Sequence, residues 1–216
     1  MQKKLDYIDI SPVIREQTGV FPGDVPYRRH ISMDLTQGHH LTLSSITTTL
    51  HIGAHVDAPN HYEKGGQSIA ERELHYYMGL CEVVTVKVPF GERILLRHLE
   101  TLEFKAPRVI FRTQSFLDPD NWNSEFCSLS EELIEHLAKA GVILVGIDTP
   151  SIDPEDAKVL QAHNAVARNN MAIIEGVVLS SVGDGLYSLM ALPLRLEGAD
   201  ASPVRAILFR DPYLLP

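Results

Sequence analysis

The chain of 216 residues has few cysteines, no long apolar run and no excess of basic residues, and each lack excludes a class of protein. Its two cysteines, Cys81 and Cys127, stand far apart without a CxxC motif, so we expect buried thiols and no disulfide framework. No apolar run approaches the roughly 20 residues of a membrane span. The formal net charge of -9 argues against electrostatic binding of nucleic acid.

The N-terminal segment also lacks a targeting signal. Residues 1–9 contain two lysines, but no apolar stretch follows them as it would in a signal peptide. We therefore expect a cytoplasmic location. Hydrophobic residues make up 44% of the chain and charged residues 22%, a composition typical of a globular protein. We expect one domain that spans residues 1–216.

The most informative segment present is residues 51–61, which contains His51, His55, Asp57 and His61. Neutral imidazole and carboxylate groups are ligands for zinc and related divalent ions. His51, His55 and Asp57 are separated by even numbers of residues, so on an extended strand their side chains leave the same face. A glycine and a proline within the segment disfavour a helix. We predict a strand that runs into a proline-containing turn and carries a metal site; a structural polar network is the alternative.

The remaining pattern predicts strands and helices in alternation. Apolar and β-branched runs predict strands over residues 41–50, 83–88, 108–113, 142–147, 171–175 and 205–210. Helices are predicted over residues 92–102 and 157–166, and the clearest helix follows a capping box at Ser128-Leu-Ser-Glu131 and ends at Gly141. The fully apolar strand that comes next indicates burial on both faces. This order favours an α/β fold with some parallel pairing.

Two later residues are the best candidates to complete a metal site. Glu175 lies in an otherwise apolar run, where a carboxylate is costly unless it is paired or bound to a metal; an exposed glutamate at a strand end is the alternative. His163 lies near the end of a predicted helix, where a surface or helix-capping role is also open. Asp148 follows the apolar strand, where α/β sites usually assemble, although a plain Asp-Thr-Pro turn explains it as well.

These blocks together resemble the metal-dependent cyclase-like amidohydrolase family. The family motif HxGTHxDxPxH matches residues 51–61 except that Ala54 replaces the threonine. Three further blocks agree in order, and they span most of the chain: Phe21-Pro-Gly-Asp24, residues 146–151 with Asp153-Pro154, and His163 with residues 174–176. The Gly-Ile-Asp-Thr-Pro-Ser block is typical of the kynurenine formamidase branch.

The resemblance implies a fold, a metal site and an assembly. The fold is a single α/β domain with a central barrel-like mixed β-sheet flanked by helices, of the swivelling β/β/α type. The implied cofactor is Zn²⁺, two ions per subunit, with Mn²⁺ or another divalent ion as alternatives. The implied ligands are His51, His55, Asp57, His61, His163 and Glu175. Asp57 would bridge the ions, and His61 is also the position of proton transfer. A homodimer that acts on a small molecule, without nucleic acid or membrane, is implied as well.

The implied activity is that of an arylformamidase, which hydrolyses N-formyl-L-kynurenine to L-kynurenine and formate in tryptophan degradation. The aryl ring needs an apolar wall, for which Phe21 is the foremost candidate, with Tyr27 and Tyr62 beside it; core packing or simple exposure also explains each. Ala54 leaves an altered substrate preference open. The alternatives are a hydrolase of another small amide or lactone such as isatin, a catalytically silent metal-binding or ligand-binding protein, and a structural protein whose polar cluster is satisfied internally.

Overall fold

The computed structural model describes residues 5–99 and 102–215. Its strands are β1 (Tyr7–Asp9), β2 (Arg28–Met33), β3 (Leu43–Thr47), β4 (His55–Asp57), β5 (Met78–Thr85), β6 (Arg93–Ile94), β7 (Arg108–Arg112), β8 (Ser128–Leu129), β9 (Leu144–Ile147), β10 (Ala172–Glu175), β11 (Gly185–Met190), β12 (Ala201–Pro203) and β13 (Ile207–Phe209). Its α-helices are α1 (Pro59–Tyr62), α2 (Glu131–Lys139) and α3 (Gln161–Arg168). Short 3₁₀ turns cover Leu35–Gln37, Ile69–Glu71, Leu74–Tyr77 and Leu96–His98.

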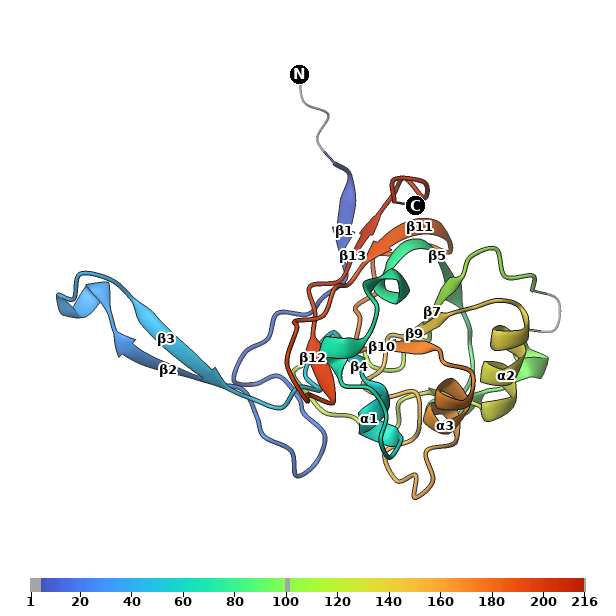
Figure 1. The fold of residues 1–216 in the computed structure, drawn as a ribbon, viewed down its shortest axis with the longest axis horizontal. Helices are drawn as coiled ribbons and strands as arrows, with labels where there is room; N and C mark the ends of the chain where they lie inside the picture. Colours follow the sequence, from blue (N-terminus) through green and yellow to red (C-terminus); the bar gives the residue numbers. More distant parts are fainter. Residues whose placement is uncertain (1–4, 100–101, 216) are drawn as a thin grey trace.

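A mixed sheet of nine strands forms the centre of the molecule and curls strongly into a half-barrel (Figure 1). The strand order is β1-β13-β11-β5-β7-β9-β10-β4-β12. The four central strands β5, β7, β9 and β10 run parallel, and the outer strands pair antiparallel. This is the mixed α/β sheet that the resemblance implies, with few helices around it. Among the described residues, no helix combines the length and the apolar character of a membrane span.

Two apolar clusters cover the two faces of this sheet. One contains Val56, Ile174 and Leu208 and fills the side enclosed by the outer strands. The other contains Leu133 and Val166, through which α2 and α3 pack on the opposite face. Strand β9 contributes to both clusters, as expected for a strand that is buried on both faces. Cys81 and Cys127 are both buried free thiols, as predicted.

Two local predictions are wrong. Residues 92–102 do not form a helix, because Arg93 and Ile94 pair with β8 and only a short 3₁₀ turn follows; residues 100–101 lie outside the described residues. Helix α2 is capped by Ser130, whose Oγ accepts a hydrogen bond from the Leu133 N–H, and not by Ser128. Ser128 belongs to β8, and its backbone N–H donates to the carbonyl of Glu92, so it is not free to begin the helix.

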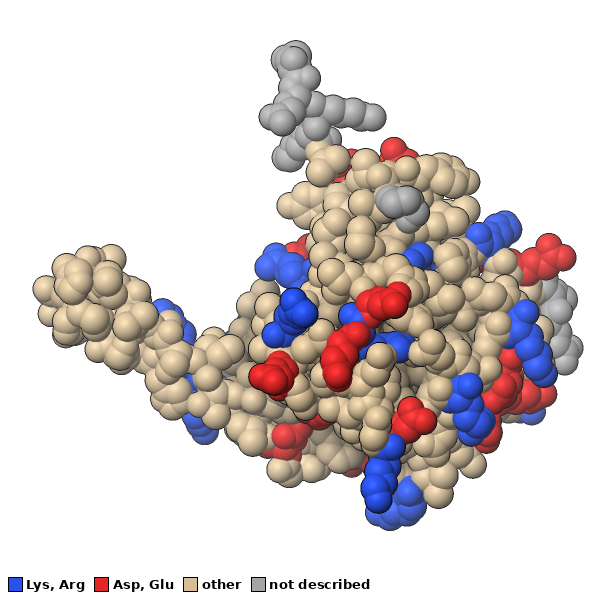
Figure 2. Space-filling model, viewed as in Figure 1, with Lys and Arg blue, Asp and Glu red and all other residues tan. Residues whose placement is uncertain are grey.

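The predicted strand over residues 41–50 forms one side of an arm that projects from the body. Within the described residues, strands β2 and β3 pair only with each other and make a long hairpin, residues 28–47, that stands away from the half-barrel (Figure 1). Its basic residues lie near the point where it joins the body (Figure 2). The backbone N–H of Thr49 donates to the carbonyl of Val25 and closes the base of this hairpin, which we call the arm.

Candidate metal centre

The site begins with two neighbouring antiparallel strands, β4 and β10. Their register places His55 directly opposite Glu175. Cross-strand partners share a face of the sheet, so the two side chains meet, with His55 Nε2 3.2 Å from Glu175 Oε2. Alternation along β4 places Asp57 on the same face as His55, with 3.6 Å between His55 Nε2 and Asp57 Oδ1. The two strands together therefore supply two carboxylates and one imidazole to one point.

Helix α3 packs over this face and adds the fourth group. His163 lies near the start of α3, and its Nε2 is 3.4 Å from Asp57 Oδ2 and 3.7 Å from Glu175 Oε1. The side chains of His55, Asp57, Glu175 and His163 are at most 3% exposed. Residues separated by more than 100 positions in the chain thus surround one buried point.

His51 reaches the same point from a bend and not from a strand. The prediction of an extended strand over residues 51–57 holds only for β4, because Gly53 has a positive φ of 59° that turns the chain. His51 Nδ1 nevertheless lies 3.1 Å from Asp57 Oδ1. The bend packs closely against Gly176. A Cβ on Gly176 would lie 2.1 Å from the carbonyl oxygen of Gly53, so only glycine fits at position 176.

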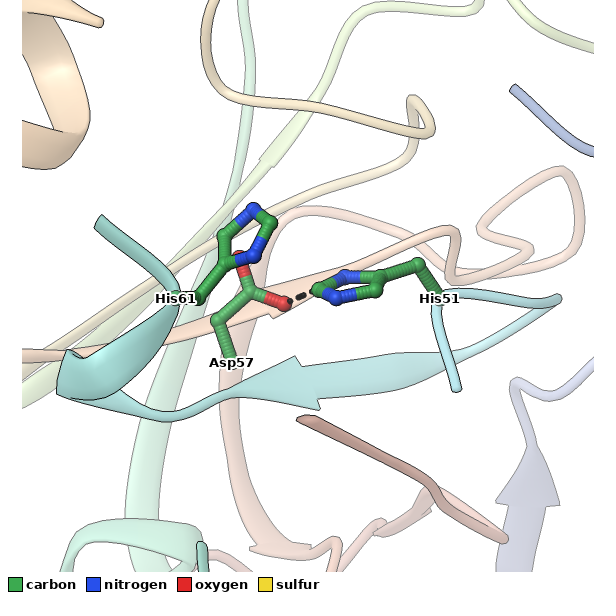
Figure 3. A group of neighbouring side chains, drawn as sticks. All are labelled: His51, Asp57 and His61. Atoms are coloured by element: carbon green, nitrogen blue, oxygen red, sulfur yellow. Dashed lines mark ion pairs between the residues drawn. The ribbon is translucent and has the colours of Figure 1, made fainter. Parts of the chain in front are cut away.

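His61 completes the open side of the group. It lies on the short helix α1, which begins at Pro59, and its ring stands 4.2 Å from the ring of His51, centroid to centroid. Figure 3 shows both imidazoles next to the Asp57 carboxylate, with the ion pair from Asp57 to His51 drawn as a dashed line. His61 is about one third exposed, and burial holds its pKa below the usual value.

The donor atoms fit a divalent metal. Among the described residues, His51, Asp57 and His61 form one group, and His55, Asp57 and Glu175 form another, each with its ligand atoms within 4.8 Å of one another. Asp57 is common to both groups. His55 Nε2 and both carboxylate oxygens of Asp57 are buried without a hydrogen-bond partner in the described part of the chain. Leaving buried polar atoms unsatisfied is costly, so a cation between them gives these atoms the partner that they lack.

The outward nitrogen of three of the histidines is held by a second group. His55 Nδ1 faces the carbonyl oxygen of Gly53 at 3.0 Å, and His163 Nδ1 faces Asp153 Oδ2 at 2.8 Å. His51 Nε2 faces Asp200 Oδ2 at 2.9 Å. Such partners fix the ring and its tautomer so that the other nitrogen is free to bind a metal.

Asp153 and Asp200 were not identified from sequence, although Asp153 lies in one of the family blocks. Asp153 is fully buried, accepts hydrogen bonds from the backbone of Ala162 and His163, and forms an ion pair of 2.8 Å with Arg93. Asp153 therefore caps the N-terminal end of α3, although it does not directly precede the helix in the sequence. Asp200 precedes β12 and also lies 3.6 Å from His61 Nδ1. Neither contact follows from spacing, since both depend on how distant loops meet.

The electrostatics of the centre favour positive charge. Burial alone lowers the pKa of His51, but the Asp57 carboxylate 3.1 Å away raises it to about 9. Burial also lowers the pKa of His163, while Asp153 and Asp57 raise it to about 10. Burial raises the pKa of Asp57, yet the neighbouring imidazoles of His163 and His51 hold the pKa well below the usual range. The carboxylates thus create a negative potential that protons or a divalent cation can neutralise.

A cavity of about 440 Å³ opens onto this centre. His51, His61, His163 and Glu175 lie in its wall. Its apolar wall contains Phe21, Trp122, Pro150, Pro154 and Leu160. The rings of Phe21 and Trp122 meet edge to face at 5.6 Å, and Trp122 Nε1 donates to Glu155. The size lies within the range of small-molecule sites.

The other substrate-wall candidates lie elsewhere. Tyr27 and Tyr62 are not among the residues that line this cavity; the ring of Tyr62 instead packs 5.3 Å from that of His163. Trp122, which sequence reasoning missed, takes their place. Ala54 is 1% exposed within the apolar core and does not line the cavity either. Asp148 accepts hydrogen bonds from the backbone N–H groups of Thr113 and Gln114, so it joins the ends of the neighbouring strands β7 and β9, and it does not line this cavity.

Comparison with known proteins shows which family this chain resembles. A family model described as "Putative cyclase" matches residues 8–154. Kynurenine formamidases of Bordetella petrii and Bordetella pertussis are 43% and 44% identical to the chain over 201 residues, which are 93% of this chain and 96% of each relative.

Solved structures resemble the fold as well. One described as a potential metal-dependent hydrolase with cyclase activity has a TM-score of 0.82 and 27% identity, and the match covers 95% of this chain and 98% of the other. An isatin hydrolase bound to a product analogue has a TM-score of 0.75 at 19% identity over 94% of this chain and 92% of the other. At that identity the likeness shows the fold alone.

Proposed function

This chain belongs to the putative cyclase family, and we propose that it is a metal-dependent arylformamidase that hydrolyses N-formyl-L-kynurenine to L-kynurenine and formate. The observation that carries the proposal is the pair of donor groups sharing Asp57 at the end of a cavity walled by Phe21 and Trp122. The likeness to the Bordetella kynurenine formamidases supplies the substrate. We place the reaction in tryptophan degradation, in the cytoplasm, with a homodimer as the assembly.

The proposed cofactor is a pair of Zn²⁺ ions, because Zn²⁺ binds readily to sites made of histidine nitrogens and carboxylate oxygens without cysteine. The proposed ligands are His51, His55, Asp57, His61, His163 and Glu175, with Asp57 as the shared carboxylate. When bound, the ions supply Lewis-acid polarisation of the formyl oxygen and a water molecule activated near neutral pH. Asp153, Asp200 and the carbonyl of Gly53 hold three of the imidazoles in the orientation that this task requires.

The protein's own residues bind the substrate and move the proton. Phe21 and Trp122 pack against the aryl ring and keep water from that wall of the cavity. Asp24 and Glu155 line the same cavity and offer negative charge to the α-ammonium group of the substrate. When its ring is not bound to an ion, His61 takes a proton from the attacking water through Nε2, the nitrogen not turned to Asp200, and gives it to the aryl amine nitrogen as the C–N bond breaks.

The proposal is tested with one sample and two substrates. Metal content is measured by elemental analysis, and the same protein is then assayed on N-formyl-L-kynurenine and on isatin, with and without a chelator. We expect stoichiometric metal, turnover of the formamide, little turnover of the cyclic amide and loss of activity with chelator. A preference for isatin would favour the cyclic-amide alternative. Bound metal without turnover of either would favour a silent binding protein.

A further inference from the structure

We propose that a second cavity, beside helices α1 and α3, binds a small oxyanion, a carboxylate or a phosphate, through Arg72. This cavity of about 370 Å³ is walled by the loop of residues 63–67, by Arg72, and by the end of α3 with the turn that follows it. Among the described residues, it has no lining residue in common with the substrate cavity. The site therefore goes beyond the proposed function, and its volume lies within the range of small-molecule sites.

Arg72 brings a buried positive charge to the wall of this cavity. The residue is 6% exposed, and no carboxylate of the described residues forms an ion pair with it. Its partners are neutral: Nη1 donates to Gln67 Oε1 and Asn170 Oδ1, and Nη2 donates to the carbonyl of Met171. Its Nε is buried without a hydrogen-bond partner in the described part of the chain. A buried charge is costly unless an opposite charge compensates it, and a bound anion supplies that charge.

Arg72 also fixes the direction of two side-chain amides. A guanidinium group only donates hydrogen bonds, so the amide oxygens of Gln67 and Asn170 face it and their NH₂ groups point away from it. Both residues are exposed and line the cavity. Each NH₂ group is therefore available to donate to a ligand. The amides and the guanidinium together make a set of hydrogen-bond donors that suits an oxyanion.

These donors are held in place by packing and by the backbone. The guanidinium carbon lies 4.2 Å from the centroid of the Tyr76 ring, which covers one face of the group. The carbonyl of Gln67 accepts a hydrogen bond from the N–H of Asn60. Gly66 lies so close to α1 that a Cβ would stand 2.6 Å from the carbonyl carbon of Pro59. A donor set fixed in this way loses little conformational entropy when an anion binds.

The charge balance of the wall favours an anion over a cation. Glu63 is the one acid among the described lining residues, and it is exposed, so solvent screens its repulsion of an anion. A cation in the same place would face the buried charge of Arg72 and gain only this screened carboxylate. The paired oxygens of a carboxylate or a phosphate match the fork of donors on a guanidinium group.

The cavity adjoins the two helices that carry candidate metal ligands. Pro59 and Tyr62 line it from α1, the helix of His61, and Ala167 lines it from α3, the helix of His163 (Figure 1). The ring of Tyr62 also packs 5.3 Å from that of His163. An anion held by Arg72 therefore joins the loop of residues 63–67 to both helices without entering the substrate cavity.

Isothermal titration calorimetry of the metal-loaded protein tests the site with inorganic phosphate, acetate and succinate, each at constant ionic strength. We expect saturable binding with a Kd of about 1 mM or tighter, and a higher melting temperature than in chloride. The anion class that binds more tightly identifies the ligand as a phosphate or a carboxylate. Because either class can also bind at the metal centre, the binding due to Arg72 is the part that the following variants remove.

Asn170→Asp is the sharpest variant. It puts a carboxylate in place of the amide oxygen that lies 2.9 Å from Arg72 Nη1, and aspartate tolerates the positive φ of 49° at this position. We expect the protein to melt no lower than the wild type, while the binding due to Arg72 weakens at least about 10-fold. Arg72→Gln should lose the same binding. Arg97→Gln, which changes an exposed arginine on a 3₁₀ turn, is the control and should bind as the wild type does.

Two outcomes overturn the proposal. One is anion binding that is unchanged in the Asn170→Asp protein. The other is a wild-type protein that binds anions only at the metal centre, which would leave Arg72 as a structural link between its loop and the turn after α3. If Arg72→Gln does not fold, Asn170→Asp decides the question alone. No turnover is measured, so failure of this site is distinct from failure of the proposed function.

Discussion

The two halves of the candidate metal centre use the same ligand types but hold them differently. In the deep half, His55, His163 and Glu175 are at most 3% exposed, and the two imidazoles are held by the Gly53 carbonyl and by Asp153. In the open half, the exposed fraction is 18% for His51, 32% for His61 and 46% for the supporting carboxylate of Asp200. Groups that must stay fixed are buried, while groups at the cavity keep access to solvent and substrate.

This difference assigns separate tasks to the two halves. The deep half lies on the β4–β10 strand pair and under α3, where the surrounding core keeps every donor in place. Such rigidity suits metal retention. The open half lies on a bend and on the one-turn helix α1, next to the cavity. It suits proton transfer and contact with the substrate.

The largest effect should come from the deep half. Glu175→Gln replaces a buried negative charge by a neutral amide, so the centre loses part of the potential that attracts a cation. We expect bound metal to fall and kcat/KM for N-formyl-L-kynurenine to drop by more than about 1,000-fold, or about 4 kcal/mol. Elemental analysis and steady-state kinetics measure both. Glu132→Gln, an exposed acid on α2, is the control. A fully metallated, active Glu175→Gln protein would contradict the deep-half assignment.

The open half should affect catalysis more than metal retention. His61→Ala removes the proposed proton carrier but leaves the group of His55, Asp57 and Glu175 intact. We expect kcat to fall by about 100- to 10,000-fold, while metal at the deep group remains. Stopped assays of formate release together with metal analysis separate the two quantities. His136→Ala, an exposed imidazole on α2, should behave as the wild type. Full activity of the His61 variant would reject its role.

Asp153 and Asp200, the carboxylates that hold ligand imidazoles, allow a direct comparison of the two halves, because the same Asp→Asn substitution is made in each. The expected effects are the smallest of the set. Asp153→Asn removes charge beside buried His163 and leaves Arg93 without its ion pair. We expect metal affinity to fall by about 10- to 100-fold and the free energy of unfolding by about 2 kcal/mol. Asp200→Asn should lower metal affinity by less than about 10-fold and leave unfolding within about 0.5 kcal/mol, because Asp200 is half exposed.

Three measurements decide this pair: competition with a metal-sensitive chelator dye, denaturant unfolding of the metal-free protein, and the separate values of kcat and KM. Asp200 acts through His51 and His61 as a positioning residue, so its variant should change kcat more than KM or stability. Equal losses of affinity and stability in both variants would remove the distinction between the two halves.

Sequence reasoning predicted regular elements where local pattern decides them. The strands β7, β9, β10 and β13 and the helices α2 and α3 lie within or close to the predicted ranges, because apolar runs and a capping serine act locally. The failures occur where long-range pairing overrides pattern. Leucine spacing over residues 92–102 predicts a helix, yet the backbone there pairs with β8. The predicted strand over residues 51–57 is interrupted because Gly53 turns the chain.

The sequence by itself determined which residues are candidate metal ligands. The dense group of histidines and one aspartate in residues 51–61, with a costly glutamate in an apolar run, selects N/O ligands for a divalent ion before any fold is known. Only the tertiary structure places Glu175 opposite His55 and His163 next to Asp57. It also places Asp153, Asp200 and Trp122 around these ligands. Residue chemistry is a property of each position, whereas distances between side chains remote in the chain depend on strand register and helix packing.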